Sequence, residues 1–332
     1  MEGHHLSFGA QALRYFRREH EGVRRAPVGG PAAWRGAELR DRDDWIVRLA
    51  PEQIDELDAA RAAARERGLS LASLDRDGFA LPTLGPFLAG LARELDRGRG
   101  FVLLRGLPVA TWGDDDAALV FLGLGLHLGE PGAQNPQDDL LGHVTDTGED
   151  AARPLVRLYR TAAHIDWHCD LADAVGLLCL RTARRGGTSR IVSSVAVYDE
   201  LLRRRPDLVD RLYEPFALDA RDEDGKGRLP FIPVPPCRFA GGQLRTFWHS
   251  DYFRSAQRHP EAPRFGAVER ELVALYEEIA GDPSFVLDMQ FEPGDVQLVS
   301  NHACLHARSA YEDGPTPAEK RHLLRLWLSL PR

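Results

Sequence analysis

A chain of 332 residues with 43% hydrophobic and 28% charged residues has the composition of a globular protein with a sizeable core, not that of a disordered or membrane protein. Its 50 acidic residues exceed its 42 basic residues, and the formal charge of −8 argues against a nucleic-acid partner because no basic excess neutralises phosphates. The four cysteines show no CxxC spacing, so neither a zinc ribbon nor a disulfide framework is suggested. Because no apolar leader or membrane-length apolar stretch is present, we expect a cytoplasmic protein with no membrane partner.

The first part of the chain predicts helices after an irregular start. Residues 1–45 are expected to form an irregular lead-in, because the glycine, proline and arginine clusters after residue 20 show no clear period. Apolar residues at helical spacing predict helices over 49–68, 84–97 and 113–129, and a short apolar run predicts a strand over 101–107. Residues 46–130 are therefore expected to be mostly helical.

The rest of the chain is dominated by β-type runs. Short apolar segments predict strands over 175–181, 189–194, 285–291, 295–301 and 322–330. Helices are predicted to interrupt them over 195–213 and 267–280. Helices followed by separated strands favour one α+β domain whose core is an antiparallel sandwich or barrel.

The stretch HIDWHCD, residues 164–170, contains the same metal-binding pattern twice, as His164 with Asp166 and as His168 with Asp170. On a strand all four side chains project to one face, so the spacing does not choose between the two pairs. A 2-His-1-carboxylate iron(II) centre needs one such pair and a distant histidine. The tripeptide alone is common, and a hydrogen-bonded surface pair is its more frequent meaning.

Candidates for the distant histidine and for an anion site lie near the C-terminus. His302 and His306 follow a predicted strand, and Arg321 and Arg325 lie four residues apart on another. Two arginines on one face of a strand can bind carboxylates through paired charge-assisted hydrogen bonds. This pattern fits a dicarboxylate cosubstrate.

Five blocks of sequence, in this order, resemble the taurine dioxygenase-like (TauD/TfdA) family of iron(II)/2-oxoglutarate-dependent dioxygenases. The blocks are residues 123–148, 168–181, 184–209, 291–313 and 321–331, and the resemblance runs from about residue 101 to the C-terminus. It implies a double-stranded β-helix (jelly-roll) core with flanking N-terminal and inserted helices. A single domain is then expected over 1–332, with the jelly-roll and its insertions in 131–332.

The resemblance also implies which residues bind the metal. The family's HxD motif precedes an apolar strand at the spacing of His168 and Asp170, and its distal histidine closes a segment like the one that ends at His306. These three residues are the expected iron(II) ligands, and they are also the expected catalytic centre. The earlier pair at 164 and 166 and the histidine at 302 fall outside the family's pattern.

The cosubstrate site follows from the same resemblance. Ser189 and Arg321 are expected to bind the distal C5 carboxylate of 2-oxoglutarate, and Arg325 is expected near its C1 end. The implied reaction consumes O2, converts 2-oxoglutarate to succinate and CO2, and oxidises a substrate. Since halogenating relatives replace the metal carboxylate with a small residue, Asp170 favours hydroxylation.

Substrate contacts are the least determined part of the sequence. Segments that hold substrate in the family correspond here to seven candidate residues, Gln134, Asn135, Tyr159, His164, Trp248, His249 and Arg254. The glycine- and proline-rich segment 215–266 is expected to be irregular. It is predicted to close over the substrate, with a surface excursion as the alternative. The expected partner is a small molecule such as an amino acid or a natural-product intermediate.

Four alternatives stay open at this point. Desaturation or ring closure by the same family, a non-catalytic jelly-roll binding protein, and a cupin-like enzyme that needs no 2-oxoglutarate all share parts of the pattern. The paired arginines argue against the last of these. A homo-oligomer is also left open.

Overall fold

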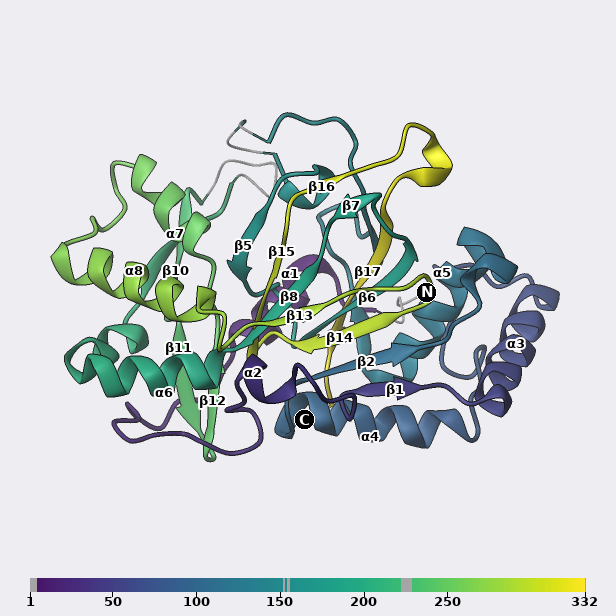
Figure 1. The fold of residues 1–332 in the computed structure, drawn as a ribbon, viewed down its shortest axis with the longest axis horizontal. Coiled ribbons are helices and arrows are strands. Elements are labelled where there is room, and N and C mark those ends of the chain that lie inside the picture. Colours follow the sequence, from purple (N-terminus) through teal and green to yellow (C-terminus); the bar gives the residue numbers. More distant parts are fainter. Residues whose placement is uncertain (1–4, 152, 154–155, 222–228, 332) are drawn as a thin grey trace.

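The computed structural model describes residues 5–151, 153, 156–221 and 229–331, and its strands form two main sheets between groups of helices (Figure 1). The larger sheet has the order β1-β2-β14-β6-β17-β3, with β4 also paired to β17, and every pairing except β1–β2 is antiparallel. Its strands are β1 (Ile46–Arg48), β2 (Phe101–Arg105), β3 (Glu130–Gly132), β4 (Leu141–Val144), β6 (Ala174–Arg181), β14 (Val296–Ser300) and β17 (His322–Ser329).

The smaller sheet is antiparallel and has the order β13-β8-β15-β5. Its strands are β5 (Ile165–His168), β8 (Ser189–Ser193), β13 (Leu287–Met289) and β15 (Cys304–Arg308). Three two-stranded ribbons complete the strands, namely β7 (Arg185–Gly186) with β16 (Tyr311–Glu312), β9 (Phe216–Asp219) with β10 (Phe231–Val234), and β11 (Cys237–Ala240) with β12 (Gln243–Thr246). The two main sheets share one apolar cluster, in which Phe101 and Trp327 of the larger sheet join Ile191 and Met289 of the smaller.

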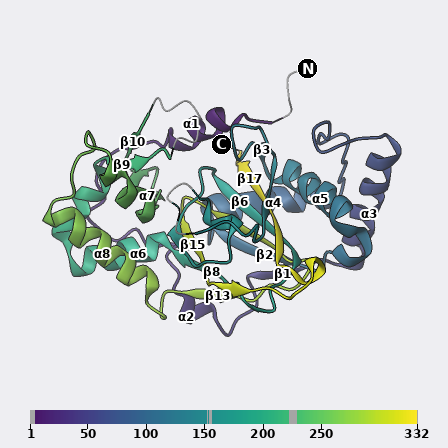
Figure 2. The same cartoon turned by 90° about the horizontal axis from the view of Figure 1, so that it is seen from above.

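Helices cover the sheets on two sides (Figures 1 and 2). The α-helices are α1 (Phe8–Phe16), α2 (Gly36–Leu39), α3 (Pro51–Glu66), α4 (Leu84–Arg97), α5 (Val109–Leu128), α6 (Ser194–Arg204), α7 (Ser250–Ser255) and α8 (Ala267–Gly281). The 3-10 helices are η1 (Leu158–Arg160), η2 (Pro206–Tyr213), η3 (Ala256–Arg258) and η4 (Pro317–Glu319). Helices α4 and α5 pack on the larger sheet, and α6 packs on α8 beside the ribbons. Within the described ranges, no helix combines the length and apolar character needed to cross a membrane.

The predicted helices over 49–68, 84–97 and 267–280 are confirmed as α3, α4 and α8. Helix α5 begins at Val109, but Gly113 interrupts it with a φ of 73°, so its longer part starts at the predicted position. The predicted helix over 195–213 is in fact α6 followed by η2, because Pro206 cannot continue an α-helix.

Two expectations about irregular segments are wrong. The lead-in over 1–45 contains α1 and α2, and α1 is held by Tyr15, whose hydroxyl donates to the carbonyls of Asn301 (3.0 Å) and Thr246 (3.3 Å). The segment 215–266 forms β9 to β12, α7 and η3, although residues 222–228 lie outside the described part. The fold is therefore mixed helix and strand throughout, and in the described ranges neither main sheet closes into a barrel.

Candidate active site

Strand register brings two histidines of distant sequence together. His306 of β15 lies directly opposite His168 of β5 in the smaller sheet. Residues directly opposite each other in an antiparallel pair project to the same face, and the two imidazole rings lie 4.1 Å apart between centroids. The pairing of β5 with β15 therefore brings the two imidazole rings together.

Asp170 completes this cluster from the loop after β5. Its backbone N–H donates to Oδ1 of Asn301 (3.0 Å), and Nδ2 of Asn301 donates to the carbonyl of Ala172 (3.0 Å). One ligand-type atom from each of His168, Asp170 and His306 lies within 4.8 Å of the others. Asn301 thus orients the loop that brings the carboxylate to the two rings.

The charge environment of Asp170 and His306 suits a metal ion. Burial raises the pKa of Asp170, but the neighbouring Arg325 outweighs it and brings the pKa below its usual value. Burial and the neighbouring His168 lower the pKa of His306 to about 3, so its ring is neutral at neutral pH. A carboxylate with two imidazoles is the donor set that non-haem iron(II) oxygenases use.

Unused polar atoms point the same way. Oδ1 of Asp170 accepts from Arg325 (3.3 Å), whereas its Oδ2 is buried without a hydrogen-bond partner in the described residues and lies 3.8 Å from Nε2 of His306. Nδ1 of His168 is 2.8 Å from the carbonyl of Asp166 and therefore carries the proton, which leaves Nε2 free to bind a metal. These residues fit a divalent cation.

The other metal-ligand candidates lie elsewhere. Nε2 of His164 contacts Oδ1 of Asp166 at 2.9 Å, and both side chains are about half exposed, as a surface pair would be. His302 is buried 2.8 Å from Asp173 and stacks on Tyr15. Of the two HxD pairs and the two C-terminal histidines, the structure brings together only the later pair and His306.

Arg325 reaches the cluster from β17 and is held on several sides. Its Nε donates to Oε1 of Gln134 (2.7 Å), and its guanidinium lies over the rings of Tyr159 (4.8 Å) and Trp327 (4.9 Å). Gln134 also donates to the backbone carbonyl of Arg325 (2.6 Å). Gln134 and Tyr159, which were expected to contact substrate, therefore hold the arginine that faces Asp170.

Arg321 is also buried and lies immediately before β17, but it has fewer partners. It lines a cavity of about 260 Å³ together with Cys179 and Leu323, and its NH2 approaches the carbonyl of Gly187 at 3.5 Å. Gly187 has a φ of 70°, and a Cβ at this position would lie 2.9 Å from Nε of Arg321. Only glycine allows the backbone to pass so close to the guanidinium.

Ser189 is placed by β8 inside the molecule, where its hydroxyl donates to Oε1 of Gln297 (3.1 Å). No hydrogen bond joins Ser189 directly to Arg321 in the described residues. Gln297 is one of three buried polar residues near the site that were not predicted from the sequence, with Asn301 and Arg308. Alternation identifies Arg308, because it stands two positions after His306 and shares its face of the strand.

The remaining substrate candidates have mixed positions. His249 lies beside the metal cluster, with its ring 5.2 Å from that of His168 and 3.8 Å from Tyr252. Asn135 is a half-buried loop residue that donates to Asp139 (2.8 Å), and Arg254 forms an ion pair with Glu277 of α8.

The prediction that Trp248 contacts substrate is not supported by its position. Trp248 is fully buried, and its indole stacks on Tyr276 of α8 with centroids 3.9 Å apart. The residue therefore packs in the core between α7 and α8. An aromatic residue in a glycine-rich segment was mistaken for a binding residue because the helix that covers it is distant in sequence.

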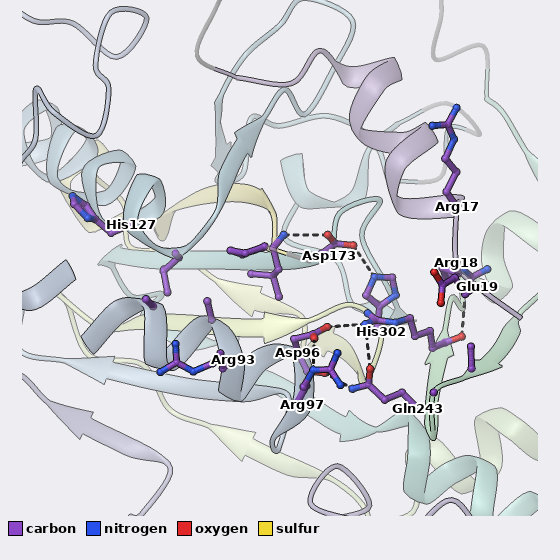
Figure 3. A pocket seen from close by; sticks show the side chains of 18 of the residues that line it. Arg17, Arg18, Glu19, Arg93, Asp96, Arg97, His127, Asp173, Gln243 and His302 are labelled. Carbon is purple, nitrogen blue, oxygen red and sulfur yellow. Dashed lines mark hydrogen bonds and ion pairs between the residues drawn. The ribbon is translucent and has the colours of Figure 1, made fainter. Parts of the chain in front are cut away.

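A separate cavity of about 590 Å³ lies where α1, α4 and the β11–β12 ribbon meet (Figure 3). His302 and Asp173 line it, and Asp96 pairs there with Arg245 (2.8 Å). None of the three clustered metal-ligand candidates lines it. Asp173, which lines the cavity, accepts through its backbone carbonyl from the N–H of Asn301 (2.9 Å). The cavity therefore lies next to Asn301, which orients the Asp170 loop, and not at the metal cluster itself.

Comparison with known proteins agrees with the class that this site defines. The model of the family described as "Taurine catabolism dioxygenase TauD, TfdA family" matches residues 61–327. FR-33289 synthase of Streptomyces rubellomurinus is 32% identical over 318 residues, which cover 93% of this chain and 92% of that protein. The taurine hydroxylase-like protein SAT17 of Stachybotrys chartarum is 29% identical over 89% of this chain and 77% of that protein.

Solved structures share the fold. An asparagine oxygenase in complex with Fe(II), hydroxyasparagine and succinate superposes with a TM-score of 0.66 at 17% identity, covering 86% of this chain and 94% of the other. The non-haem iron oxygenase OrfP with Fe and α-ketoglutaric acid gives a TM-score of 0.65 at 16% identity, covering 86% and 93%. The chain belongs to the TauD/TfdA family. It is an oxygenase of the iron(II)- and 2-oxoglutarate-dependent class, as the sequence predicted.

Proposed function

We propose that the protein hydroxylates a small polar metabolite at iron(II) held by His168, Asp170 and His306. The observation that carries this proposal is the gathering of one carboxylate and two imidazoles within 4.8 Å, with a buried carboxylate oxygen that has no hydrogen-bond partner in the described residues. An amino acid or a natural-product intermediate is the proposed substrate class. The names of the relatives, which include a uridine-5'-phosphate dioxygenase of Amycolatopsis, favour a polar and charged molecule.

Bound iron(II), with 2-oxoglutarate and O2, supplies the oxidising power that no side chain provides. The chain's own residues bind, orient and exclude water. Arg321 and Ser189 are proposed to bind the distal carboxylate of 2-oxoglutarate, and Arg325 to face its C1 end while it balances the charge of Asp170. The rings of Tyr159 and Trp327 screen Arg325 from water. His249 is the substrate candidate that lies beside the cluster.

We further propose that the two main sheets are the halves of a jelly-roll and that 1–332 is a single domain. The apolar cluster shared by both sheets supports this arrangement. A reducing, cytoplasmic setting is proposed as well, because all four cysteines are buried and unpaired.

The two HxD pairs provide a matched test of the metal site. We expect His168→Ala and Asp170→Ala to abolish succinate formation from 2-oxoglutarate and to weaken iron(II) binding, since each removes a ligand. His164→Ala and Asp166→Ala change the same residue types on the same segment and should leave both unchanged. Succinate and bound iron are measured on the purified protein with a panel of small metabolites.

Equal losses in the two pairs, or full activity in His168→Ala, would contradict the assignment. Iron binding is the readout that does not depend on knowing the substrate. Far-UV circular dichroism shows whether each variant keeps its fold.

A further inference from the structure

Arg308 is a buried arginine on the same strand as a proposed metal ligand. It follows His306 by two positions on β15, so the two side chains share one face of the strand, and only 5% of Arg308 is exposed. A single nitrogen, NH2, donates to the backbone carbonyls of Thr161 (2.7 Å), Ala163 and Leu158 (3.4 Å). This nitrogen thus fixes the segment that carries Tyr159.

The other two nitrogens of Arg308 are unused. Nε and NH1 are buried and have no hydrogen-bond partner among the described residues, and the same holds for NH1 of Arg321. Both guanidinium groups lie against one aromatic ring, that of Tyr311, at 4.8 Å for Arg308 and 5.2 Å for Arg321. Buried donors are almost always paired, so a cluster of unpaired donors calls for an acceptor that is not a side chain of this protein.

The charge of that acceptor follows from the two guanidinium groups. A guanidinium keeps its proton in proteins, so Arg308 and Arg321 are both cationic at neutral pH. Asp313 is nearby, but its Oδ1 accepts from the backbone N–H of Arg321 (2.8 Å), and its Oδ2 has no hydrogen-bond partner among the described residues. Two like charges buried at one ring are stabilised by an anion that both can reach.

We propose that Arg308 is a second arginine of the site for the distal carboxylate of 2-oxoglutarate. It acts there together with Arg321, and both guanidinium groups lie against the Tyr311 ring. This inference rests on the proposed function. A carboxylate offers two oxygens with about four lone pairs, enough for the free nitrogens of both guanidinium groups. Arg308 then has two tasks, because NH2 holds the 158–163 segment while Nε and NH1 bind the cosubstrate.

A pair of 2-oxo acids separates these two tasks. 2-Oxopentanoate has the same metal-binding end as 2-oxoglutarate but lacks the distal carboxylate. Dissociation constants of both acids are measured without O2 on the iron(II)-loaded protein, from the visible charge-transfer band of the complex. We expect the wild-type protein to prefer 2-oxoglutarate strongly, and Arg308→Gln and Arg321→Gln each to reduce that preference roughly tenfold or more, because each removes charge-assisted hydrogen bonds.

The matched control is Arg190→Gln, which removes an arginine of β8 that pairs with Asp288 (2.9 Å) and should leave the preference unchanged. If Arg308→Gln weakens both acids equally, Arg308 only holds the 158–163 segment and the inference is wrong. If the wild-type protein shows no preference, or Arg321→Gln keeps it, the proposed cosubstrate site fails instead.

Arg308→Lys covers the case in which the glutamine variant does not fold. Lysine retains a charged donor for the carbonyls but loses the planar fork, so the variant should fold and still lose part of the preference. A folded lysine variant with the full wild-type preference would also overturn the inference.

Discussion

Arg325 of β17 and Arg321, which immediately precedes this strand, are both buried but differ in their partners, and this difference assigns them different tasks. Arg325 is occupied by Gln134 and Asp170, whereas Arg321 keeps a free nitrogen beside a cavity. An arginine whose donors are used can balance charge and hold position, and an arginine with free donors can bind a ligand. The spacing of the two residues in the sequence predicted that both share one face of a strand, but it did not distinguish them, because their partners come from segments far away in the chain.

Gln134 tests this view of Arg325. Gln134→Ala leaves the buried Nε of Arg325 without its acceptor, so we expect the free energy of unfolding to fall by about 1.5–3 kcal/mol, as for a hydrogen bond to a charged group. Denaturant unfolding measures the change. Asn135→Ala is the neighbouring control, because Asn135 is a loop residue that bonds to Asp139 at the surface, and a loss as large as that of Gln134→Ala would contradict the expectation.

The sequence predicted best the residues that belong to a motif of fixed spacing. His168 and Asp170 stand two positions apart before an apolar strand, and the family's block order singled out His306, so the cluster was predictable before the fold was known. Arg308 and Asn301 were not predicted, since their roles depend on the carbonyls and amide that they meet only after folding.

At the scale of elements, the turn at 186–187 between β7 and β8 controls how close the backbone comes to Arg321. Gly186 and Gly187 both have positive φ values, 71° and 70°. The sequence stretch before Ser189 contains both glycines, but a glycine pair alone does not reveal what it approaches. The contact with Arg321, which immediately precedes β17, follows from sheet packing.

Gly187→Ala should therefore affect more than the backbone. Alanine at a positive φ is strained by about 1 kcal/mol or more, and its Cβ would also push against Nε of Arg321. We expect weaker binding of 2-oxoglutarate together with lower stability. Gly241→Ala is the matched control, because Gly241 has a φ of 56° with no atom within 4 Å of the added Cβ, so it should lose stability without losing 2-oxoglutarate affinity. Equal affinities in the two variants would count against a role for the turn.

Long periodic elements were predictable and short paired ones were not. Helices α3, α4 and α8 each repeat their apolar face over three or more turns, which is enough for the pattern to appear in the sequence. The ribbon of β11 and β12 has four residues in each strand, and its one local signal was the Gly241–Gly242 pair, which is typical of a hairpin turn. That signal was present in the segment that we had expected to be irregular.

For the whole molecule, histidines that are fully or partly buried link stability to pH. Burial lowers the pKa of both His302 and His322 to about 4, whereas an unfolded histidine titrates near 6.5. Between these values the unfolded chain binds protons that the folded chain does not, so the free energy of unfolding falls as the pH drops from about 6.5 to 4. Each histidine contributes a slope of up to about 1.4 kcal/mol per pH unit.

Urea unfolding of the metal-free protein at pH 7, 6 and 5 measures this slope. His322→Gln removes one of the two groups and should flatten the dependence by up to that amount. An unchanged slope in this variant would show that His322 is not buried in its neutral form.

The position of β5 at the edge of its sheet affects the stability of the protein without iron. β5 is the edge strand of its sheet, paired with β15 on one side and joined on the other to His249 by an isolated bridge at His168. Edge strands expose backbone groups that invite pairing with other chains. If iron is bound as proposed, His168 of β5 and His306 of β15 are ligands of one centre. The metal site then holds β5 to β15 in addition to the hydrogen bonds between the strands. Loss of iron would thus weaken the attachment of β5 to β15 as well as abolish activity, and we expect aggregation to begin at this edge of the smaller sheet.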